Sequence, residues 1–208
     1  FYFLLLTFNF FLTAQGRWLC STAESIFKIN IIITLHRKQN HQVMKYRRYI
    51  KGTIPVSEIG LGAWQLGHNS GWQSMSEHDA IELVEKALDY GINFIDTAPN
   101  YGRGTSEERL GKALKNKDRS KIVINTKFGH TDQGTLNYSS SYIRESLEGS
   151  LRRLQVDFID SLIIHNPPAG YLDGNKNDHY DILEKLMEEG KNKAYGAFLD
   201  TFEDIKSL

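Results

Sequence analysis

The sequence predicts an α/β fold of the (β/α)₈ (TIM) barrel type, with about five of the eight strand–helix units present. Strand-like and helix-like segments alternate at intervals of roughly 30–36 residues, which is the size of a βαβ unit. The strand-like segments are almost continuous apolar runs, as in parallel strands covered on both faces. Polar, reactive side chains follow several of these runs, as they do at the C-terminal face of such barrels.

Five core strands are expected, each a short apolar run bounded by turn residues. They cover residues 58–64, 92–96, 121–127, 158–164 and 194–199. A hairpin over residues 46–57, turning at Lys51-Gly52, precedes the first of them. A doubly wound nucleotide-binding sheet would carry Gly-X-Gly-X-X-Gly after its first strand. The corresponding stretch, Gly60-Leu-Gly62-Ala-Trp-Gln65, lacks the third glycine, which favours the barrel.

A helix is expected after each core strand, because apolar residues recur there at helical spacing. Four of the five helices begin with a capping pattern, in which a short polar side chain precedes an acidic one by three residues. The capping pairs are Ser76–Asp79, Thr105–Glu108, Asp178–Asp181 and Thr201–Asp204. The remaining helix is recognised by one apolar face, formed by Ile143, Leu147, Leu151 and Leu154. Gly91 and Gly190 are expected to end the first and fourth helices.

Residues 1–43 differ in character from the rest of the chain. They open with FYFLLLTFNFFL, an apolar run shorter than the roughly 20 residues that span a bilayer and without a basic segment before it. We expect residues 1–43 to be translated upstream sequence; a targeting or membrane-associated extension is the alternative. The second predicted unit, residues 44–208, starts at Met44. Such barrels take about 250 residues, so about three strand–helix units are expected to be missing from this chain.

The composition argues against several classes of function. Lys plus Arg and Asp plus Glu both number 25, so the formal net charge is zero and no basic stripe indicates nucleic-acid binding. The single cysteine, Cys20, leaves no intrachain disulfide and fits a reducing, cytoplasmic environment. The seven histidines show no metal-ligand spacing, so no metal site is expected. A small-molecule enzyme remains the favoured class, with no membrane, metal or nucleic-acid partner.

Four polar residues at the ends of three successive strands point to acid–base chemistry. They are Asp96, Tyr101 in the loop that follows, Lys127 and His165. A tyrosine hydroxyl can donate a proton, but its unperturbed pKa is about 10. A nearby ammonium group lowers that pKa by favouring the phenolate. Taken singly, each residue has an ordinary structural role as the alternative: a turn former, a packing tyrosine, a surface lysine or a hydrogen-bonded histidine.

The stretches FIDTAPNYGRGTSEERLGKAL, NTKFG and LIIHNP occur in an order that resembles the aldo-keto reductase family, and the opening MKYRRYI resembles its bacterial members. The resemblance covers residues 44–208. It implies a catalytic tetrad in which Tyr101 is the general acid, Lys127 tunes it, Asp96 holds Lys127, and His165 positions the substrate carbonyl. It also implies an NAD(P)H-dependent oxidoreductase that interconverts an aldehyde, ketone or sugar carbonyl with its alcohol.

The same resemblance implies where cofactor and substrate lie. NADP is expected more than NAD. The expected cofactor contacts are Gly62, Ala63, Asp96 and Asn166. Trp64 is expected to form a wall of the substrate pocket with Tyr101 and His165, with core packing as the alternative role for Trp64.

One position departs from the family pattern. The family usually has Gly-Val-Ser-Asn at the end of the fifth strand, where Ser and Asn bind the nicotinamide carboxamide. This chain has Gly196-Ala197-Phe198-Leu199-Asp200, and the Phe198 ring cannot donate that hydrogen bond. Two other interpretations stay open: a non-catalytic, cofactor-sensing relative similar to the potassium-channel β subunits, and an inactive gene fragment. By itself, the chain is not expected to turn over substrate.

Overall fold

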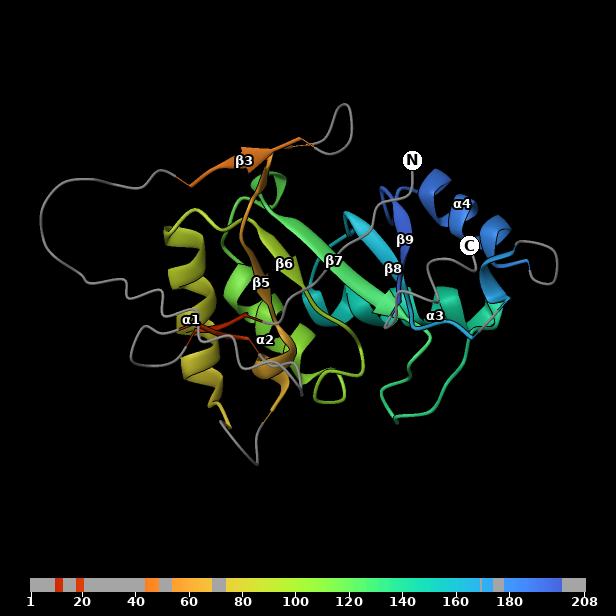
Figure 1. Ribbon diagram of the computed structural model, residues 1–208, viewed down its shortest axis with the longest axis horizontal. Helices are drawn as coiled ribbons and strands as arrows, with labels where there is room; N and C mark the ends of the chain where they lie inside the picture. The colour runs from red at the N-terminus through yellow and green to blue at the C-terminus, as the bar shows by residue number, and fades with distance from the viewer. Residues whose placement is uncertain are drawn as a thin grey trace, which may run out of the picture.

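A computed structural model describes residues 10–12, 18–20, 44–48, 54–68, 74–168, 170–173 and 178–199. Its centre is a five-stranded parallel sheet whose strands follow one another in chain order (Figure 1). The strands are β5 (Gly60–Gly62), β6 (Phe94–Asp96), β7 (Val123–Phe128), β8 (Ser161–His165) and β9 (Tyr195–Phe198). This arrangement confirms the predicted parallel α/β architecture, although β5 and β6 are shorter than the apolar runs that predicted them.

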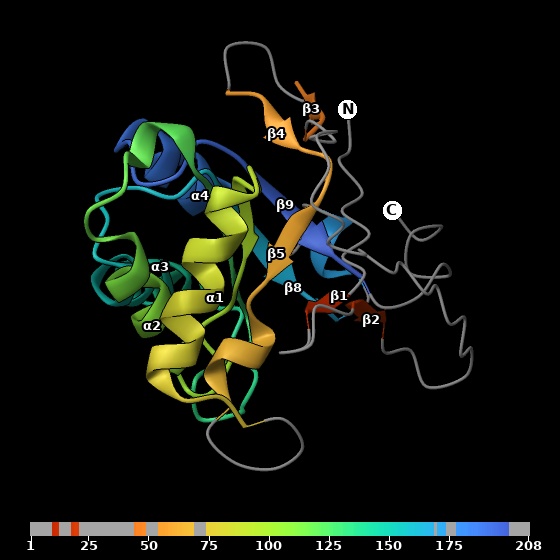
Figure 2. The same ribbon diagram turned by 90° about the vertical axis from the view of Figure 1, so that its left-hand side faces the viewer.

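The described residues form four α-helices, which cover one face of the sheet (Figure 2). They are α1 (Glu77–Asp89), α2 (Thr105–Leu114), α3 (Ser140–Leu154) and α4 (His179–Glu188). Three short 3-10 helices lie in the connections: η1 (Trp64–Gly67), η2 (Arg119–Lys121) and η3 (Tyr171–Asp173). Helices on the outer face and strands in sequential order are the arrangement of a (β/α)₈ barrel wall.

The predicted helix starts are confirmed only in part. The Ser76 side chain accepts a hydrogen bond from the backbone N–H of Asp79, as a capping box requires. The cap predicted at Thr105 is wrong: the N-cap of α2 is Gly104, whose φ of 89° suits a glycine, and Thr105 is the first helical residue. Asp178 is the N-cap of α4, but its side chain makes no capping bond. The helix predicted to start at Thr201 lies outside the described residues.

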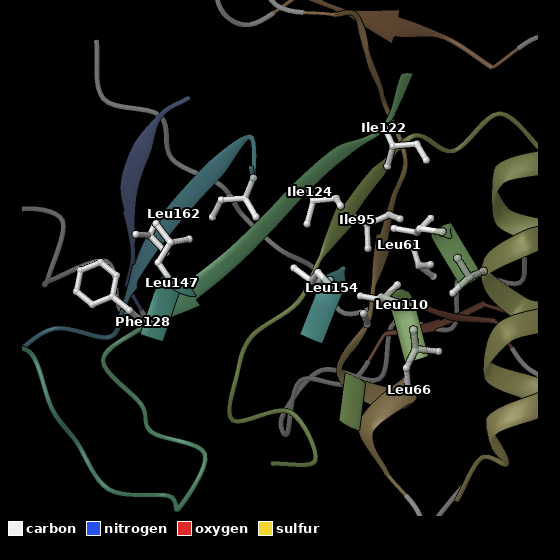
Figure 3. Packing of buried hydrophobic residues seen from close by; sticks show 14 of the residues in the cluster. Leu61, Leu66, Ile95, Leu110, Ile122, Ile124, Phe128, Leu147, Leu154 and Leu162 are labelled. Atoms are coloured by element: carbon white, nitrogen blue, oxygen red, sulfur yellow. The ribbon is translucent and has the colours of Figure 1, made fainter. Parts of the chain in front are cut away.

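Alternation along the strands divides the side chains between two faces, because successive residues of a strand point in opposite directions. The outward-facing side chains pack with the helices into one apolar core (Figure 3). Core residues that are almost inaccessible to solvent include Ile95, Ile124, Phe128, Leu162, Leu110, Leu147 and Leu154. Each such side chain contributes roughly 1.5–3 kcal/mol by leaving water. The alternate residues of the strands therefore point to the inner face, where the polar residues gather.

Two antiparallel hairpins precede the sheet. Strands β3 (Tyr46–Arg47) and β4 (Val56–Ser57) pair as predicted, and the predicted turn at Lys51-Gly52 lies outside the described residues. The Asn93 side chain ties this hairpin to the start of β6, accepting from the backbone N–H of Ser57 at 2.8 Å.

Within residues 1–43, the structure describes only β1 (Phe10–Leu12) and β2 (Trp18–Cys20), which pair antiparallel. None of the helices among the described residues is long and apolar enough to cross a membrane. The boundary expected at Met44 stays a prediction.

Candidate active site

The inner face of β6 and β7 carries a buried ion pair at the C-terminal edge of the sheet. The Lys127 Nζ atom lies 2.9 Å and 2.8 Å from the two carboxylate oxygens of Asp96. It also lies 3.0 Å from the backbone oxygen of Thr97 and 3.1 Å from the Tyr101 hydroxyl. Lys127 is only 2% exposed and Asp96 6% exposed. The structure thus brings Asp96, Tyr101 and Lys127 together as the sequence predicted.

This set of contacts explains how a lysine remains charged in the interior. An ammonium group has three protons to donate, and here a carboxylate, a carbonyl and a hydroxyl receive them. Burial lowers the pKa of Lys127, but the attraction of Asp96 and the contact with Tyr101 outweigh it, so the pKa is raised above its ordinary value. Lys127 is therefore an ammonium ion throughout the neutral pH range.

Two residues that the sequence did not reveal extend this cluster. The Asn125 side-chain N–H donates to the Asp96 carboxylate, and the Ser161 hydroxyl donates to the Asn125 carbonyl oxygen. Asn125 lies two residues before Lys127 on β7, so both side chains point to the inner face. This chain of hydrogen bonds links β6, β7 and β8 and fixes the orientation of the carboxylate.

Tyr101 is placed by a close approach of two backbones. A Cβ atom on Gly102, whose φ is +62°, would lie 2.0 Å from the backbone oxygen of Gly67. A Cβ atom on Gly67 would lie 2.6 Å from the backbone of Tyr101. Only glycine fits at these two positions, and their contact sets the loop carrying Tyr101 against η1.

Side chains and backbone in the first half of α2 form hydrogen bonds with the same two loops. The Ser106 hydroxyl donates to the backbone oxygen of Ala63 at 2.7 Å, and its backbone N–H donates to the oxygen of Tyr101 at 3.2 Å. The Arg109 guanidinium donates to the backbone oxygen of Leu66. The TSEER segment, which the sequence marked only as a helix start, therefore fixes the position of Tyr101.

Two opposing effects set the pKa of Tyr101. Burial raises the pKa, and the attraction of Lys127 lowers it, as the sequence predicted. Burial is the larger effect, so the pKa of Tyr101 is raised above its ordinary value. At neutral pH, Tyr101 is therefore a protonated phenol that can act as a donor.

His165 ends β8 on the same face, with its ring edge-on to that of Tyr101 at a centroid distance of 6.3 Å. The imidazole of His130 lies against the His165 ring, with 4.4 Å between the ring centroids. The centroid of the Phe198 ring lies 5.8 Å from that of His165. Burial, followed by the charge of Lys127 and the proximity of His130, lowers the pKa of His165 from 6.5 to about 3. His165 is therefore neutral at pH 7. His130 was not among the predicted residues, because nothing in its local sequence distinguishes it.

This pKa shift predicts how stability depends on pH. Above about pH 6.5, His165 is neutral in both the folded and the unfolded state and contributes nothing. Below that pH, His165 becomes protonated in the unfolded chain but stays neutral in the folded protein. The free energy of unfolding therefore falls as pH falls toward 3. In a completed barrel, His165→Asn should therefore lose less stability between pH 7 and pH 5 than the parent protein, measured as urea midpoints. His78→Asn, at an exposed histidine, is the control; equal acid sensitivity in all three proteins would contradict the shift.

The remaining predicted site residues lie around the cluster. Gly62 ends β5 opposite Asp96, and the Ala63 backbone N–H donates to the oxygen of Asp96 at 2.8 Å. Asn166 follows His165 in a left-handed conformation, with φ of 48°. Trp64 begins η1, is 40% exposed and contacts the His68 ring at 4.1 Å. The expected cofactor and pocket roles of these residues stay predictions.

The described residues contain one group of potential metal ligands, His78, Asp79 and Glu82, on the first turns of α1. All three are exposed. The Glu82 carboxylate pairs with Lys86 at 2.6 Å, and an Asp79 carboxylate oxygen accepts from Ser76. These groups are not part of the tetrad cluster.

Comparison with known proteins agrees with this geometry. Residues 58–208 match the model of the Aldo/keto reductase family. Among curated proteins, the chain is 39% identical over 145 residues to L-galactose dehydrogenase of Arabidopsis thaliana, covering 69% of this chain and 44% of that protein. It is 35% identical over 176 residues to the aldo-keto reductase YhdN of Bacillus subtilis, covering 79% and 52%.

Solved structures give the same result. The holo form of an aldo-keto reductase from Bacillus halodurans matches with a TM-score of 0.66 and 34% identity, over 78% of this chain and 53% of that one. An aldo-keto reductase from Klebsiella pneumoniae in complex with NADPH matches with a TM-score of 0.60 and 28% identity, over 74% and 49%. The chain thus spans about half the length of the curated relatives it matches. By its sequence and its fold, the chain belongs to the aldo/keto reductase family.

Proposed function

We propose that these residues form the proton-donor half of an NAD(P)H-dependent reductase active site, acting on an aldehyde, ketone or sugar carbonyl. The observation that carries this proposal is the contact of the Tyr101 hydroxyl with the buried Lys127 ammonium at 3.1 Å. The dihydronicotinamide, when bound, supplies the hydride. Tyr101 then gives its proton to the carbonyl oxygen as negative charge develops there.

The raised pKa of Tyr101 is compatible with this role. A buried phenol resists losing its proton in the resting site, and so remains available as a donor. As the proton leaves, negative charge appears on the Tyr101 oxygen, 3.1 Å from a fixed ammonium. This attraction grows only during proton transfer, so it stabilises the transition state more than the resting state. Asp96 and Asn125 keep the ammonium in place.

We assign His165 the role of orienting the carbonyl. A neutral imidazole carries one N–H donor, which can hold the carbonyl oxygen beside the Tyr101 hydroxyl. An imidazolium at the same place would be repelled by Lys127, which is one reason why the pKa of His165 is low.

The residues present fit a nicotinamide in part. Strands β5, β6 and β8 bring Gly62, Asp96 and Asn166 to one edge of the sheet, where the ring would have to meet the tetrad. Ala63 is wholly buried, with its backbone N–H engaged by Asp96 and its oxygen by Ser106, so we propose that it supports the cofactor site from within the core. We propose NADP as the preferred cofactor.

Phe198 gives a test of the carboxamide site. Its ring packs against His165 where the family usually supplies a hydrogen-bond donor. A buried carboxamide left without that donor costs about 1–3 kcal/mol. In a completed barrel, Phe198→Ser is expected to tighten NADPH binding roughly tenfold by fluorescence titration, and Phe198→Ala, which removes the ring but adds no donor, is not. Equal binding by the two variants would contradict this account of the site.

The substrate class is proposed from the relatives. One matched relative is L-galactose dehydrogenase of Arabidopsis thaliana, and another is D-threo-aldose 1-dehydrogenase of a Pseudomonas species. We therefore propose a small sugar-like carbonyl compound as substrate, in the cytoplasm, with no metal, membrane or nucleic-acid partner.

We also propose that the working unit is a closed barrel, to which residues 44–199 supply the first five strands. A chimera can supply the other three. In this chimera, hereafter the chimeric barrel, the chain to residue 199 is continued by the C-terminal part of the Bacillus halodurans relative. Residues 1–43 are proposed to be dispensable, so a chimera that starts at Met44 should behave in the same way.

The function is tested by following NADPH oxidation by the chimeric barrel with a panel of aldoses and simple aldehydes. Turnover with at least one carbonyl compound, abolished by Tyr101→Phe, is the expected result. NADPH binding without turnover of any compound would instead support the cofactor-sensing alternative. Neither binding nor turnover would support the inactive fragment.

The 208-residue polypeptide alone should not behave as a monomeric enzyme. Within the part of the chain that the structure describes, β5 and β9 each pair along one side only. Unpaired strand edges are templates for association with another chain. We expect light scattering to find oligomers or aggregates that lack NADPH-dependent reduction, whereas the chimeric barrel is a defined species. A monodisperse, active monomer of the 208-residue polypeptide would contradict this expectation.

A further inference from the structure

The loop between β7 and α3 carries a tyrosine that reaches across to the end of β8. The Tyr138 hydroxyl lies 2.7 Å from the backbone oxygen of His165 and 2.7 Å from that of Asn166. One phenolic proton is thus shared between two carbonyl acceptors. Burial raises the pKa of Tyr138, so its hydroxyl keeps that proton at neutral pH.

The conformation of Asn166 brings these two acceptors to one donor. Its φ of 48° is left-handed, a region that asparagine enters more readily than most residues. The turn this makes directly after His165 lets both carbonyls meet the same hydroxyl. The Asn166 backbone N–H is engaged separately, donating to the oxygen of Phe198 at 2.9 Å. Tyr138 therefore binds the carbonyls, and β9 binds a backbone N–H, of the segment that carries the candidate carbonyl-binding histidine.

The ring of Tyr138 is fixed as firmly as its hydroxyl. Gly129 has a φ of +110°, and a Cβ atom there would lie 2.2 Å from the Tyr138 ring. The ring therefore lies directly against the backbone two residues after Lys127. The Tyr171 ring also packs against the Tyr138 ring, with 5.2 Å between the ring centroids. The Tyr171 hydroxyl donates to the Tyr138 backbone oxygen at 2.7 Å. Tyr138 thus joins the end of β7 to the end of β8.

We infer that Tyr138 is a positioning residue for the reaction: through its hydrogen bonds to the His165 and Asn166 carbonyls, it sets where the His165 imidazole lies relative to Tyr101. This inference rests on the proposed function, since it assigns Tyr138 a part in orienting the substrate carbonyl. Among the described residues, the buried Nδ1 atom of the His165 ring has no hydrogen-bond partner. Its orientation must therefore come from its backbone and from ring packing.

The test is Tyr138→Phe in the chimeric barrel, with Tyr180→Phe as the matched control. Both variants remove one hydroxyl and keep the ring, and the Tyr180 hydroxyl bonds the backbone oxygen of Leu172. Tyr138→Phe should lower kcat by about 10²-fold, the cost of a small misplacement of a reacting group, with little change in the KM for NADPH. Rates are expressed per cofactor-binding molecule, so a partly folded preparation does not mimic the effect. Tyr180→Phe should keep the parental kcat.

A double-mutant comparison decides whether Tyr138 acts through His165. If it does, Tyr138→Phe should have no further effect on kcat in a His165→Ala background. Additive losses, or an unchanged kcat in the single variant, would overturn the inference.

A second measurement separates this inference from the proposed function. NMR titration of the His165 ring does not need turnover. Tyr138→Phe, but not Tyr180→Phe, should raise the pKa of His165 by more than about one unit, because a loosened ring gains access to water. That shift in a chimera without turnover would sink the proposed function and leave the positioning role intact. An unchanged His165 pKa would overturn the positioning role whatever the activity.

Discussion

Tyr101→Phe is expected to reduce turnover of the chimeric barrel by about 10²–10⁴-fold while NADPH still binds. The substitution removes the one hydroxyl that contacts the Lys127 ammonium, and with it the proposed proton donor. It keeps the ring, which lies 4.8 Å from Lys127 Nζ, so the packing of the loop should survive. Steady-state rates with a carbonyl substrate and fluorescence titration with NADPH measure the two effects separately.

Tyr90→Phe is the matched control for this prediction. Tyr90 follows α1 and is 66% exposed, so the same chemical change there should alter neither rate nor binding. The assignment of Tyr101 fails if Tyr101→Phe reduces carbonyl compounds at the parental rate. A loss of NADPH binding in Tyr101→Phe would mean that the hydroxyl supports the cofactor site instead of proton transfer.

The sequence alone was sufficient to predict the order of the elements. Each core strand is an apolar run that ends in a turn, and each helix repeats apolar residues at a period near 3.6, so type and order follow from local pattern. The predicted first and last residues of the strands were less accurate. The predicted strand included residues 92 and 93, yet β6 begins at Phe94, because the Asn93 backbone N–H donates to the Ser57 hydroxyl and its side chain accepts from the Ser57 backbone. Such a contact depends on a segment distant in sequence.

The candidate site was predictable to the extent that strand ends define it. In a parallel sheet all carboxyl ends lie at one edge, so Asp96, Lys127 and His165 had to be neighbours once the sheet was assumed. Asn125 and Ser161 were not predicted because their roles come from pairing between strands. His130 was not predicted because its role comes from ring packing against His165. Ser161 is the neighbour of Asn125 in the register of β7 and β8, and no local pattern predicts that register.

The pKa of Tyr101 illustrates a different limit. The sequence identified the lysine that favours the phenolate, but the outcome depends on how far burial opposes it. Burial is a property of the packed loop, where Gly67 and Gly102 allow two backbones to touch. The residues of the site could therefore be named from the sequence, but the balance of energies at Tyr101 could not.

Strand β7 shows why the site is rigid. Its inner-facing Lys127 belongs to the candidate site, and the preceding residue, Thr126, faces the helices. The Thr126 hydroxyl donates to Glu107 at 2.7 Å, and the same fully buried carboxylate pairs with Arg153 at 2.7 Å. An ion pair between the buried Glu107 carboxylate and the partly exposed Arg153 thus lies on the outer face of the strand, opposite the ion pair of the inner face. Both pairs join residues distant in sequence, which is why the motifs containing Glu107 and Arg153 indicated only helices.

Lys127→Met is expected to have a larger effect than Tyr101→Phe, because it should reduce stability as well as turnover. Methionine has a similar length but no charge, so the buried Asp96 carboxylate loses the ammonium that both of its oxygens contact. Removing one partner of a buried ion pair costs about 3–5 kcal/mol of unfolding free energy. Turnover should fall at least as far as in Tyr101→Phe, because the developing phenolate also loses its counter-charge.

Urea unfolding of the chimeric barrel at pH 7 measures the loss of stability in Lys127→Met relative to the parent. NADPH oxidation with a carbonyl compound measures the loss of turnover.

Asp96→Asn combined with Lys127→Met distinguishes a lost charge balance from lost packing. Asparagine is nearly isosteric with aspartate and cannot ionise, so the double variant should recover much of the stability lost by Lys127→Met and none of its turnover. If the double variant were no more stable than Lys127→Met, the deficit would come from packing around the methionine. If Lys127→Met retained the parental turnover, the Lys127 ammonium could not be what stabilises the Tyr101 phenolate, and the mechanism proposed for this site would have to be abandoned.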